Sequence, residues 1–362
     1  MKRIADFPNK PGKHCISTAI RDIFELNGYD FPEEFIFGLD SSLGFELMGH
    51  DKPALQPLFL GGKRTTFDGS ICRSLGLTLI EGKPSDDEAA WREVQAYLDS
   101  GVPVMVQADM YYLDYFRSNA FHFGGHMFVL TGYDEAERIV YVSERQDPLL
   151  REKEGPFYRL SMDRLRQARG PIEGDPLSPD RKYYVFRFDR ELSRVDISAA
   201  VQKAVRFNAE SYLNLSGELS GVSGIAGLRP SLSRRVDELL GGGLPKERAV
   251  KEIKKQLLML AANIETNGTG GGLFRSMYAA FLAFARREYG LSAAYDEASG
   301  RFEESGRLWS RIAGRLTKMS GGLSGETAPG DFESFNRDMD RDLGQIRRLE
   351  ERAFEALLHE TK

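Results

Sequence analysis

Cysteine is scarce in this chain, which has only Cys15 and Cys72 among its 362 residues. Two cysteines do not make a disulfide framework, and two reduced thiols fit the cytoplasm. A secretory signal is not expected either, because the first residues reach Pro8 and Pro11 without an apolar stretch behind them. The expected location is therefore the cytoplasm.

Long apolar runs and an excess of positive charge are also missing. The longest apolar run, residues 277–285, is about half of the roughly 20 residues that a membrane helix needs. The net charge of −5 gives no electrostatic reason to expect a nucleic acid or an anionic membrane as a partner. We therefore expect no nucleic acid and no membrane as partners.

The sequence contains neither a typical zinc-binding spacing nor a phosphate-binding loop. The histidines do not combine with a cysteine in a spacing typical of zinc ligands. The glycine-rich residues 267–272 precede a helical pattern, but they lack the Gly-Lys-Ser/Thr ending of a phosphate loop. These observations argue against a zinc site and against nucleotide hydrolysis, and we expect no metal and no cofactor.

The chain is too long for one ordinary core, and its character changes near residue 190. The periodicity before this point predicts helices at 16–26 and 86–98 and strands at 102–107, 127–133, 139–143 and 182–188. After it, the pattern predicts helices at 197–213, 246–265, 276–289 and 333–358, with Asp196 able to cap the first. We expect an α+β domain at 1–190 with a largely antiparallel sheet, and an all-α domain at 191–362.

Cys15 lies directly before the first predicted helix and after an entry rich in proline and glycine. A thiol at a helix N-terminus is close to unsatisfied N–H groups and to the positive end of the helix dipole, and both favour the nucleophilic thiolate. The alternative is a small buried residue, as most cysteines are. The position of Cys15 favours the nucleophile, whereas Cys72 fits a buried helix residue.

His126 begins a predicted strand and follows Gly124 and Gly125, which would let another backbone or a substrate approach closely. A thiolate needs an imidazole as ion-pair partner and as proton donor to the leaving group. Taken alone, His126 is more simply interpreted as a core histidine bonded to a carbonyl. Together with Cys15, it is the candidate base.

The base needs a partner that orients it. The predicted hairpin returns through residues 139–143, so arms of equal length would bring Glu144 beside the start of the His126 strand. Glu144 is therefore the candidate orienting group, although a solvated carboxylate at a strand end is the alternative. Ser143 is a weaker candidate for the same role.

The oxyanion donors are a separate question. The backbone N–H of Cys15 is one candidate. The side-chain amide of Asn9, six residues upstream, is a second, but an asparagine between prolines is also an ordinary turn former. We include Asn9 among the candidate catalytic residues.

Several other residues are candidates for contact with a substrate. His14 adjoins the nucleophile, but neighbouring side chains usually point apart, so it is a poor base; His122 is a second candidate base. Asp109 and Tyr111 are expected to line the pocket, with packing as the alternative for the aromatic ring. In the helical half, the turn that contains Gly271 could approach a substrate through its backbone, and Arg275 could face a carboxylate or phosphate.

Several stretches resemble the butirosin biosynthesis protein H N-terminal domain family. The resemblance rests on residues 14–19 (His-Cys-Ile-Ser-Thr-Ala), 37–39 (Phe-Gly-Leu), 107–113, 122–126 (His-Phe-Gly-Gly-His), 131–134 and 160–169. Residues 264–272 and 274–282 are similar to the helical domain that commonly follows it. The resemblance covers nearly the whole chain.

This resemblance implies a fold related to papain-like and bacteriocin-processing cysteine peptidases, with the helical domain covering the cleft. It places Cys15, His126 and Glu144 at the expected Cys, His and acidic positions, although the family more often has Asp at the last. Its namesake moves an acyl group from an acyl carrier protein to an aminoglycoside amine. The implied function is cysteine-dependent acyl transfer from a thioester, on a small molecule or a carrier protein, to an amine in secondary metabolism.

Two alternatives remain at this point. One is a cysteine hydrolase or peptidase with the same three residues, and the other is a binding protein that keeps only the fold. The helices after residue 195 carry apolar faces that they would cover only partly by themselves. We therefore expect these helices to pack on the first domain or on a second subunit of a homodimer.

Overall fold

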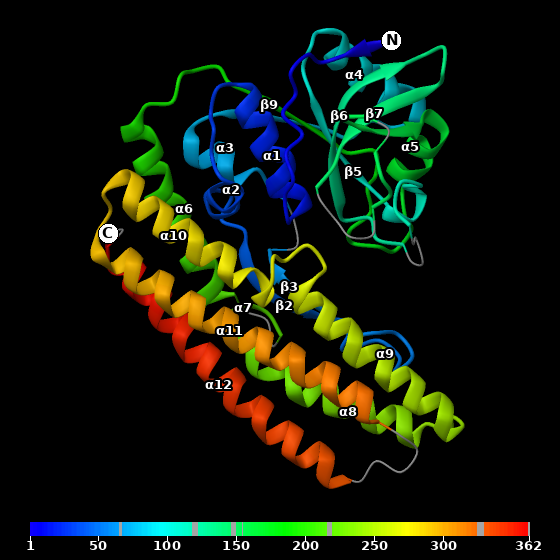
Figure 1. Cartoon of the computed structure of the whole chain (residues 1–362), viewed down its shortest axis with the longest axis vertical. Coiled ribbons are helices and arrows are strands. Elements are labelled where there is room, and N and C mark those ends of the chain that lie inside the picture. Colours follow the sequence, from blue (N-terminus) through cyan, green and yellow to red (C-terminus); the bar gives the residue numbers. More distant parts are fainter. Residues whose placement is uncertain are drawn as a thin grey trace. The chain divides into compact units, whose positions relative to one another are not determined.

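Of the 362 residues, the computed structural model describes all except 65–66, 118–121, 146–149, 154, 216–218, 324–328 and 361–362. The chain divides into two compact units, here called unit 1 (Met1–Ile36 and Leu75–Leu192) and unit 2 (Phe37–Ser74 and Ser193–Lys362). Unit 1 contains the large sheet and unit 2 most of the helix (Figure 1). The chain is therefore α+β, as predicted.

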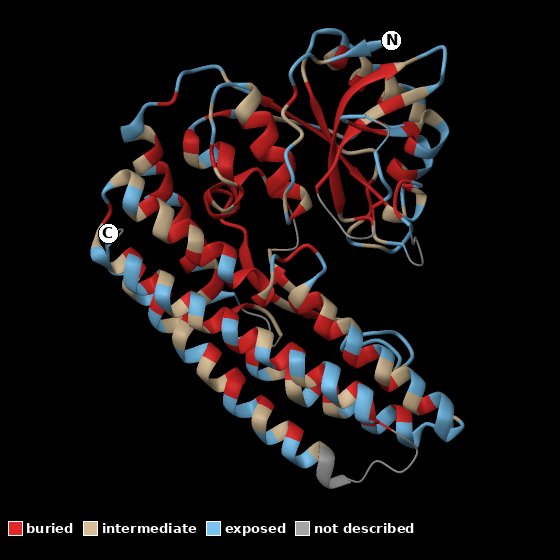
Figure 2. Ribbon diagram, viewed as in Figure 1, coloured by how far each residue is buried: buried red, intermediate tan, exposed pale blue. Residues whose placement is uncertain are grey.

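Seven strands of unit 1 form one antiparallel sheet, in the order β4-β9-β5-β6-β7-β8 with β1 paired to β6. They are β1 (Lys2–Arg3), β4 (Thr78–Gly82), β5 (Val104–Ala108), β6 (His126–Asp134), β7 (Ile139–Ser143), β8 (Tyr158–Ser161) and β9 (Tyr183–Arg187). The helices α4 (Asp87–Asp99) and α5 (Met162–Arg169) pack on this sheet. Their apolar side chains share one core with residues of β5, β6 and β7 (Figure 2).

Two predicted features of unit 1 are confirmed and position the candidate site. The helix α1 (Cys15–Leu26) begins one residue before the predicted start and packs on β6 through a buried apolar stripe. The predicted hairpin is β6 and β7, which pair from Asp134 opposite Ile139 to Val129 opposite Ser143. A register shift between Leu130 and Gly132 interrupts the ladder. After α1, the chain continues into α2 (Glu33–Leu39).

Unit 2 combines a small antiparallel sheet with long helices. The sheet consists of β2 (Leu43–Met48) and β3 (Phe59–Lys63), and α3 (Ser70–Leu75) follows it. The helices after residue 192 are α6 (Arg194–Asn214), α7 (Gly221–Gly224), α8 (Leu228–Gly241), α9 (Lys246–Glu265), α10 (Arg275–Tyr289), α11 (Ala293–Gly322) and α12 (Pro329–Glu360). The buried faces of these helices, red in Figure 2, form the core of the unit.

The cap of α6 differs from the prediction. Ser193 is the N-cap, because its side chain accepts a hydrogen bond from the backbone N–H of Asp196. The Asp196 side chain in turn accepts one from the backbone N–H of Ser193, 3.0 Å away. Asp196 is therefore the third helical residue of a capping box and not the cap itself.

Unit 2 includes a segment that the sequence analysis assigned to the first domain, residues 1–190. Residues 37–74 pack with the helices after residue 192, and the chain leaves unit 1 at Leu192. That residues 191–362 cover a cleft stays a prediction.

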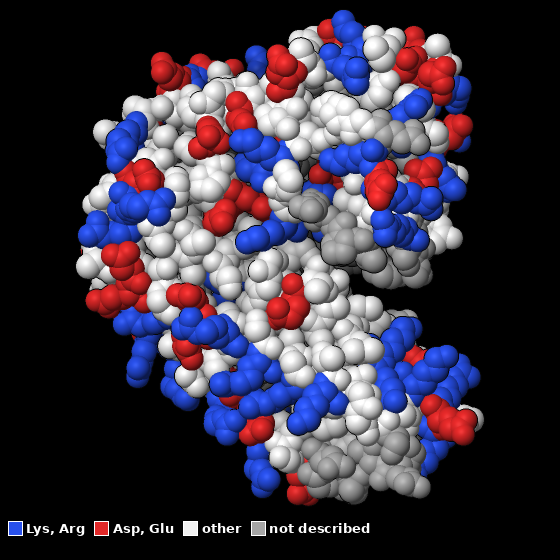
Figure 3. Space-filling view, in the orientation of Figure 1, with Lys and Arg blue, Asp and Glu red and all other residues white. Residues whose placement is uncertain are grey.

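Among the described residues, no helix has both the length and the apolarity of a membrane span. Basic and acidic side chains are interspersed on the face shown in Figure 3.

Candidate active site

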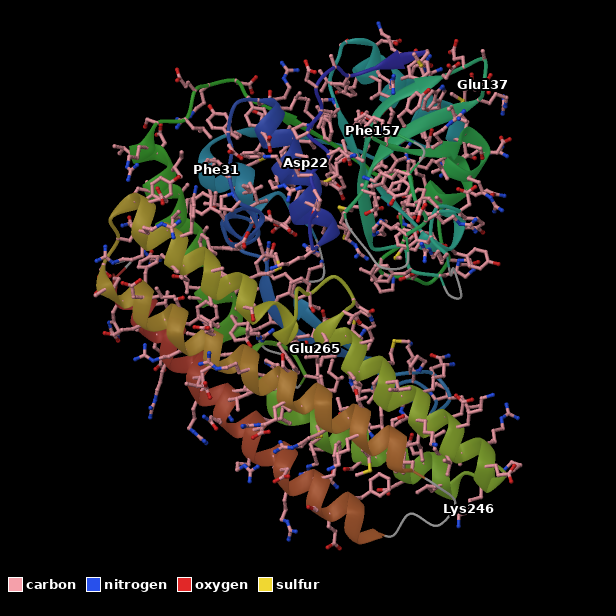
Figure 4. All side chains as sticks on the ribbon, in the orientation of Figure 1. Asp22, Phe31, Glu137, Phe157, Lys246 and Glu265 are labelled. Atoms are coloured by element: carbon pink, nitrogen blue, oxygen red, sulfur yellow. The ribbon has the colours of Figure 1, made fainter. Side chains whose placement is uncertain are left out.

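The segment before Cys15 is held in place by carboxylates. The buried Glu33 side chain accepts hydrogen bonds from the backbone N–H groups of Lys13 and His14, both at 2.8 Å, and from the Ser17 hydroxyl at 3.0 Å. Asp22 on α1, labelled in Figure 4, accepts one from the backbone N–H of Lys10 at 3.2 Å. These contacts fix where the chain enters α1, and so they fix the position of the thiol.

His126 and Glu144 come together at the open end of the β6–β7 hairpin. Continuing the register by one residue places Glu144 opposite Phe128, so it is a diagonal neighbour of His126 on the same face. His126 Nε2 lies 2.6 Å from Glu144 Oε2, and both side chains are buried. The length of the glutamate side chain suits this diagonal reach.

Glu144 has further partners that hold its carboxylate in position. The buried Tyr115 hydroxyl donates to Glu144 Oε2 at 3.2 Å, and the backbone N–H of Arg145 donates to Oε1 at 2.9 Å. With His126, these donors bond both carboxylate oxygens. A carboxylate that is held in this way can orient an imidazole in one direction.

The other ring nitrogen of His126 is the one available to Cys15. Cys15 and His126 interact electrostatically, and Glu144 occupies Nε2, which leaves Nδ1 for the thiol. The three side chains therefore belong to one local cluster, with a hydrogen bond between His126 and Glu144.

Electrostatics favours an ion pair between Cys15 and His126. Burial opposes ionisation of Cys15, but its interactions with His14 and His126 outweigh this effect and hold the thiol pKa well below its usual value. Burial also opposes the charge on His126, whereas the Glu144 carboxylate and the interaction with Cys15 raise its pKa to about 9. Thiolate and imidazolium are thus favoured together at neutral pH.

His14 has a larger role than its neighbouring position suggests. It is the N-cap of α1, and its ring accepts a hydrogen bond from the backbone N–H of Ser17. Of the groups that lower the Cys15 pKa, His14 contributes the strongest charge interaction. Neighbouring side chains point apart in a strand, but here the backbone turns from extended at His14 into the helix at Cys15.

Both the oxygen and the nitrogen of the Asn9 side-chain amide form hydrogen bonds. Its oxygen accepts a hydrogen bond from the Ser143 hydroxyl at 2.8 Å, and its nitrogen donates to the carbonyl of Pro156. Asn9 therefore ties the N-terminal segment to the end of β7. The role of Asn9 as an oxyanion donor stays a prediction. Of the two candidates to orient His126, Glu144 bonds to the imidazole, whereas Ser143 bonds to the Asn9 amide.

Three residues expected to line the pocket form a second cluster. His122 Nδ1 lies 2.5 Å from the buried carboxylate of Asp109, and the half-exposed His122 ring stacks on Tyr111 at a centroid distance of 4.2 Å. The other Asp109 oxygen accepts from the backbone N–H groups of Tyr111 and Phe123. Their contact with a substrate stays a prediction.

The structure gives Gly124 a packing role. A side-chain carbon on Gly124 would lie 2.6 Å from the carbonyl oxygen of Leu177, so only glycine fits this position. The expected close approach of another backbone to the glycine pair before His126 is therefore found at Gly124.

Arg275 and Gly271 belong to unit 2. The fully buried Arg275 guanidinium donates to Glu350 at 2.8 Å and 3.1 Å and to the Tyr212 hydroxyl at 2.8 Å. Its donors therefore face a protein carboxylate where the sequence suggested a substrate anion. Gly271 lies in a run of positive-φ residues that begins at Gly270 and leads through Leu273 and Phe274 into α10. Near this turn the backbone N–H of Gly272 donates to Glu265, which is labelled in Figure 4.

Replacing Arg275 by alanine should lower the free energy of unfolding by about 3–5 kcal/mol, because Glu350 would remain buried without its cation. Urea unfolding followed by circular dichroism checks this. The matched control is Arg287→Ala on the exposed face of the same helix, with an expected change within about 0.5 kcal/mol. A loss below about 1 kcal/mol for Arg275→Ala would contradict the structural role.

A cavity of about 310 Å³ adjoins the candidate site in unit 1. Its described lining comprises Pro11, Glu144, Arg145, Leu150, Arg151, Glu152, Lys153 and Tyr158. It thus reaches the carboxylate that orients His126. Among the described residues, no three His, Cys, Asp or Glu side chains gather into a possible set of metal ligands.

Replacing Glu144 by glutamine should lower the His126 pKa from about 9, because the negative charge that favours the imidazolium is lost. The alkaline limit of the Cys15–His126 ion pair should then move to lower pH, and turnover should fall roughly 10²–10⁴-fold. The rate of Cys15 alkylation against pH reads out the first effect without any substrate. Tyr115→Phe is the matched control, since it removes one hydrogen bond from Glu144 but no charge. Equal profiles for wild type and Glu144→Gln would contradict the orienting role.

Two family models match consecutive parts of the chain. The model for "Butirosin biosynthesis protein H, N-terminal" matches residues 14–145, which include Cys15, His126 and Glu144. The model for "Domain of unknown function (DUF4872)" matches residues 163–357. Among curated proteins, none matches the chain.

Proposed function

Since the chain belongs to the butirosin biosynthesis protein H N-terminal family, joined to a DUF4872 domain, we propose that it is a cysteine-dependent acyltransferase. The family name connects the chain with the biosynthesis of a secondary metabolite. The observation that carries the proposal is the buried hydrogen bond between His126 and Glu144, next to a Cys15 thiol whose pKa His14 and His126 hold well below its usual value.

The proposed reaction has two steps. The Cys15 thiolate attacks the carbonyl carbon of an acyl thioester, a bond forms between that carbon and Sγ, and the bond to the donor sulfur breaks. The departing thiolate takes the proton of the His126 imidazolium and leaves as a free thiol. An amine then attacks the acyl-enzyme and gives up a proton to His126, so that an amide is released and the Cys15 thiolate is restored.

The start of α1 supports stabilisation of the tetrahedral intermediates. The N–H groups in the first turn of a helix have no partner within the helix and can face a developing oxyanion. The backbone N–H groups of Lys13 and His14 already donate hydrogen bonds to Glu33. We therefore propose the next backbone N–H, that of Cys15, as the oxyanion donor. In this proposal, the Glu144 side chain orients the imidazole, and an acyl carrier protein or a small thioester provides the acyl group.

A hydrolase with the same residues is the second candidate, since water could resolve the same acyl-enzyme. Water is present at about 55 M, so a transferase must hold its amine close to the acyl group. The experiment is to load the enzyme with acyl thioesters and then offer a panel of amines. Partitioning mainly toward amide supports transfer.

Decay of the acyl-enzyme at one rate with and without amines would favour the hydrolase. Failure of every thioester and ester to acylate Cys15 would instead favour a binding protein on this fold.

A further inference from the structure

Unit 1 contains a second cavity, of about 450 Å³, which the proposed reaction does not use. It is bounded by α4, α5 and the turn between β6 and β7. Its lining residues are Asp87, Ala90, Trp91, Glu135, Arg138, Met162, Asp163, Leu165, Arg166, Arg169 and Arg181. All of these residues lie in unit 1, and none of them is Cys15, His126 or Glu144.

One end of this cavity, at the turn between β6 and β7, lies far from the candidate active site, whereas Arg169 follows Ala168, whose carbonyl accepts a hydrogen bond from the Asp109 backbone. His126 is the first residue of β6 and Asp134 the last, so the hairpin turn that bounds the cavity is about 25 Å from His126 along the strand. Figure 4 labels Glu137, which lies in this turn. A ligand in the cavity would therefore be separate from the acyl group on Cys15.

More arginines line the cavity than carboxylates that form ion pairs with them. Arg181 Nε lies 2.6 Å from Asp87, and Arg138 lies 3.2 Å from Asp163. The third carboxylate, Glu135, accepts a hydrogen bond from Gln95 at 2.9 Å. Within the described part of the chain, Arg166 and Arg169 have no ion-pair partner.

Arg169 is the unusual member of this group, because only 3% of its surface is exposed. Its terminal nitrogens donate to the carbonyls of Ala90 at 3.2 Å and Arg181 at 2.7 Å. Its Nε has no hydrogen-bond partner among the residues that the structure describes. Burial lowers the Arg169 pKa to about 10, and Asp87 offsets only part of this effect. A buried guanidinium whose charge is only partly offset, and whose Nε lacks a hydrogen-bond partner, is costly unless an anion completes it.

The remaining lining is apolar. Ala90 and Trp91 on α4 and Met162 and Leu165 on α5 provide apolar surface next to the arginines. The Trp91 ring packs edge-on against Tyr133 at a centroid distance of 5.4 Å, which fixes its orientation. The cavity therefore offers an apolar surface and a positively charged end.

We propose that the cavity between α4 and α5 binds a small amphipathic anion, whose carboxylate or phosphate faces Arg166 and Arg169 and whose apolar body lies against Trp91 and Met162. The two kinds of anion share the chemistry that guanidinium groups recognise. A neutral molecule with the same apolar body lacks the charged contact and binds more weakly.

Trp91 gives a direct signal for this binding. The chain has two tryptophans, and Trp309 is fully buried in unit 2. The full chain is titrated with octanoate, octyl phosphate and octanol below their micelle concentrations while tryptophan fluorescence is recorded. We expect a saturable change with at least one of the two anions, and the anion that responds identifies the head group. The change should be absent in Trp91→Phe.

Arg166→Glu is the decisive variant, because Arg166 is exposed on α5 and its replacement should not unfold the protein. Binding of the anion should weaken roughly tenfold or more. The matched control is Arg164→Glu, on the same helix but outside the lining, with affinity within about twofold of wild type. Binding of octanol as tight as that of the anions, no saturable signal with either anion, or unchanged affinity in Arg166→Glu would overturn the proposal.

Discussion

Replacing Cys15 by alanine is expected to reduce acyl transfer by about 10³-fold or more, because no other residue in the proposed mechanism can form the acyl-enzyme. The assay is release of thiol from an acyl thioester in the presence of an amine. His126 and Glu144 would remain in place, so binding of the thioester should persist while turnover is lost.

Cys72→Ala is the matched control, since Cys72 is the other cysteine and is buried in α3 of unit 2. It should cost some stability through a small cavity but leave transfer within about threefold of wild type. Transfer that survives in Cys15→Ala and is lost in Cys72→Ala would exclude Cys15 as the nucleophile.

The second prediction with a large expected effect is selective alkylation of Cys15 over Cys72. Near pH 7, iodoacetamide should modify Cys15 at least about 10³ times faster than Cys72, because the thiolate is the reactive form. His14 and His126 hold the Cys15 pKa well below its usual value, whereas burial raises the Cys72 pKa to about 12. Peptide mapping by mass spectrometry after timed exposure measures both rates.

The pH dependence of this alkylation follows from the direction of the two shifts at the site. A lowered Cys15 pKa keeps the thiolate at pH values where an ordinary cysteine is protonated, so the rate should fall only in more acidic solution. A raised His126 pKa keeps the imidazolium until about pH 9, where its deprotonation should give a second inflection. A single inflection at the pKa of an ordinary thiol would contradict the ion pair.

Local patterns predicted the elements that carry the candidate site. The stripe from Ile16 predicted α1 to within one residue, and the two β-like runs around a charged loop predicted the β6–β7 hairpin. The range 246–265 of α9 was predicted without error. Hairpin geometry placed Glu144 near His126 because register in a hairpin is set by the turn and is a local property.

The residues that the sequence did not reveal act over long separations. Glu33 holds the backbone before Cys15 from another helix, and Tyr115 reaches Glu144 across 29 positions. No periodicity or motif connects such positions, because their contact depends on how helices and strands pack. The assignment of residues 37–74 to unit 2 depends on tertiary contacts in the same way.

The helix α11 was missed for a different reason. Its glycines lower the helix propensity of the segment, so the pattern did not indicate thirty helical residues. The structure explains one of them, since a side-chain carbon on Gly306 would lie 3.0 Å from Ser276 Oγ, and one on Gly272 would lie 2.8 Å from the Gly306 backbone. Gly306 therefore serves close packing against the turn before α10, and tertiary contacts outweigh its local propensity.

The most direct measurement of the central claim is the intact mass of the protein after a brief reaction with an acyl thioester and no amine. The account predicts an increase equal to one acyl group, mapped by proteolysis to Cys15, absent in Cys15→Ala and present in Cys72→Ala. An acyl group attached to another residue, or a mass that stays unchanged with thioesters of every chain length offered, would contradict the account.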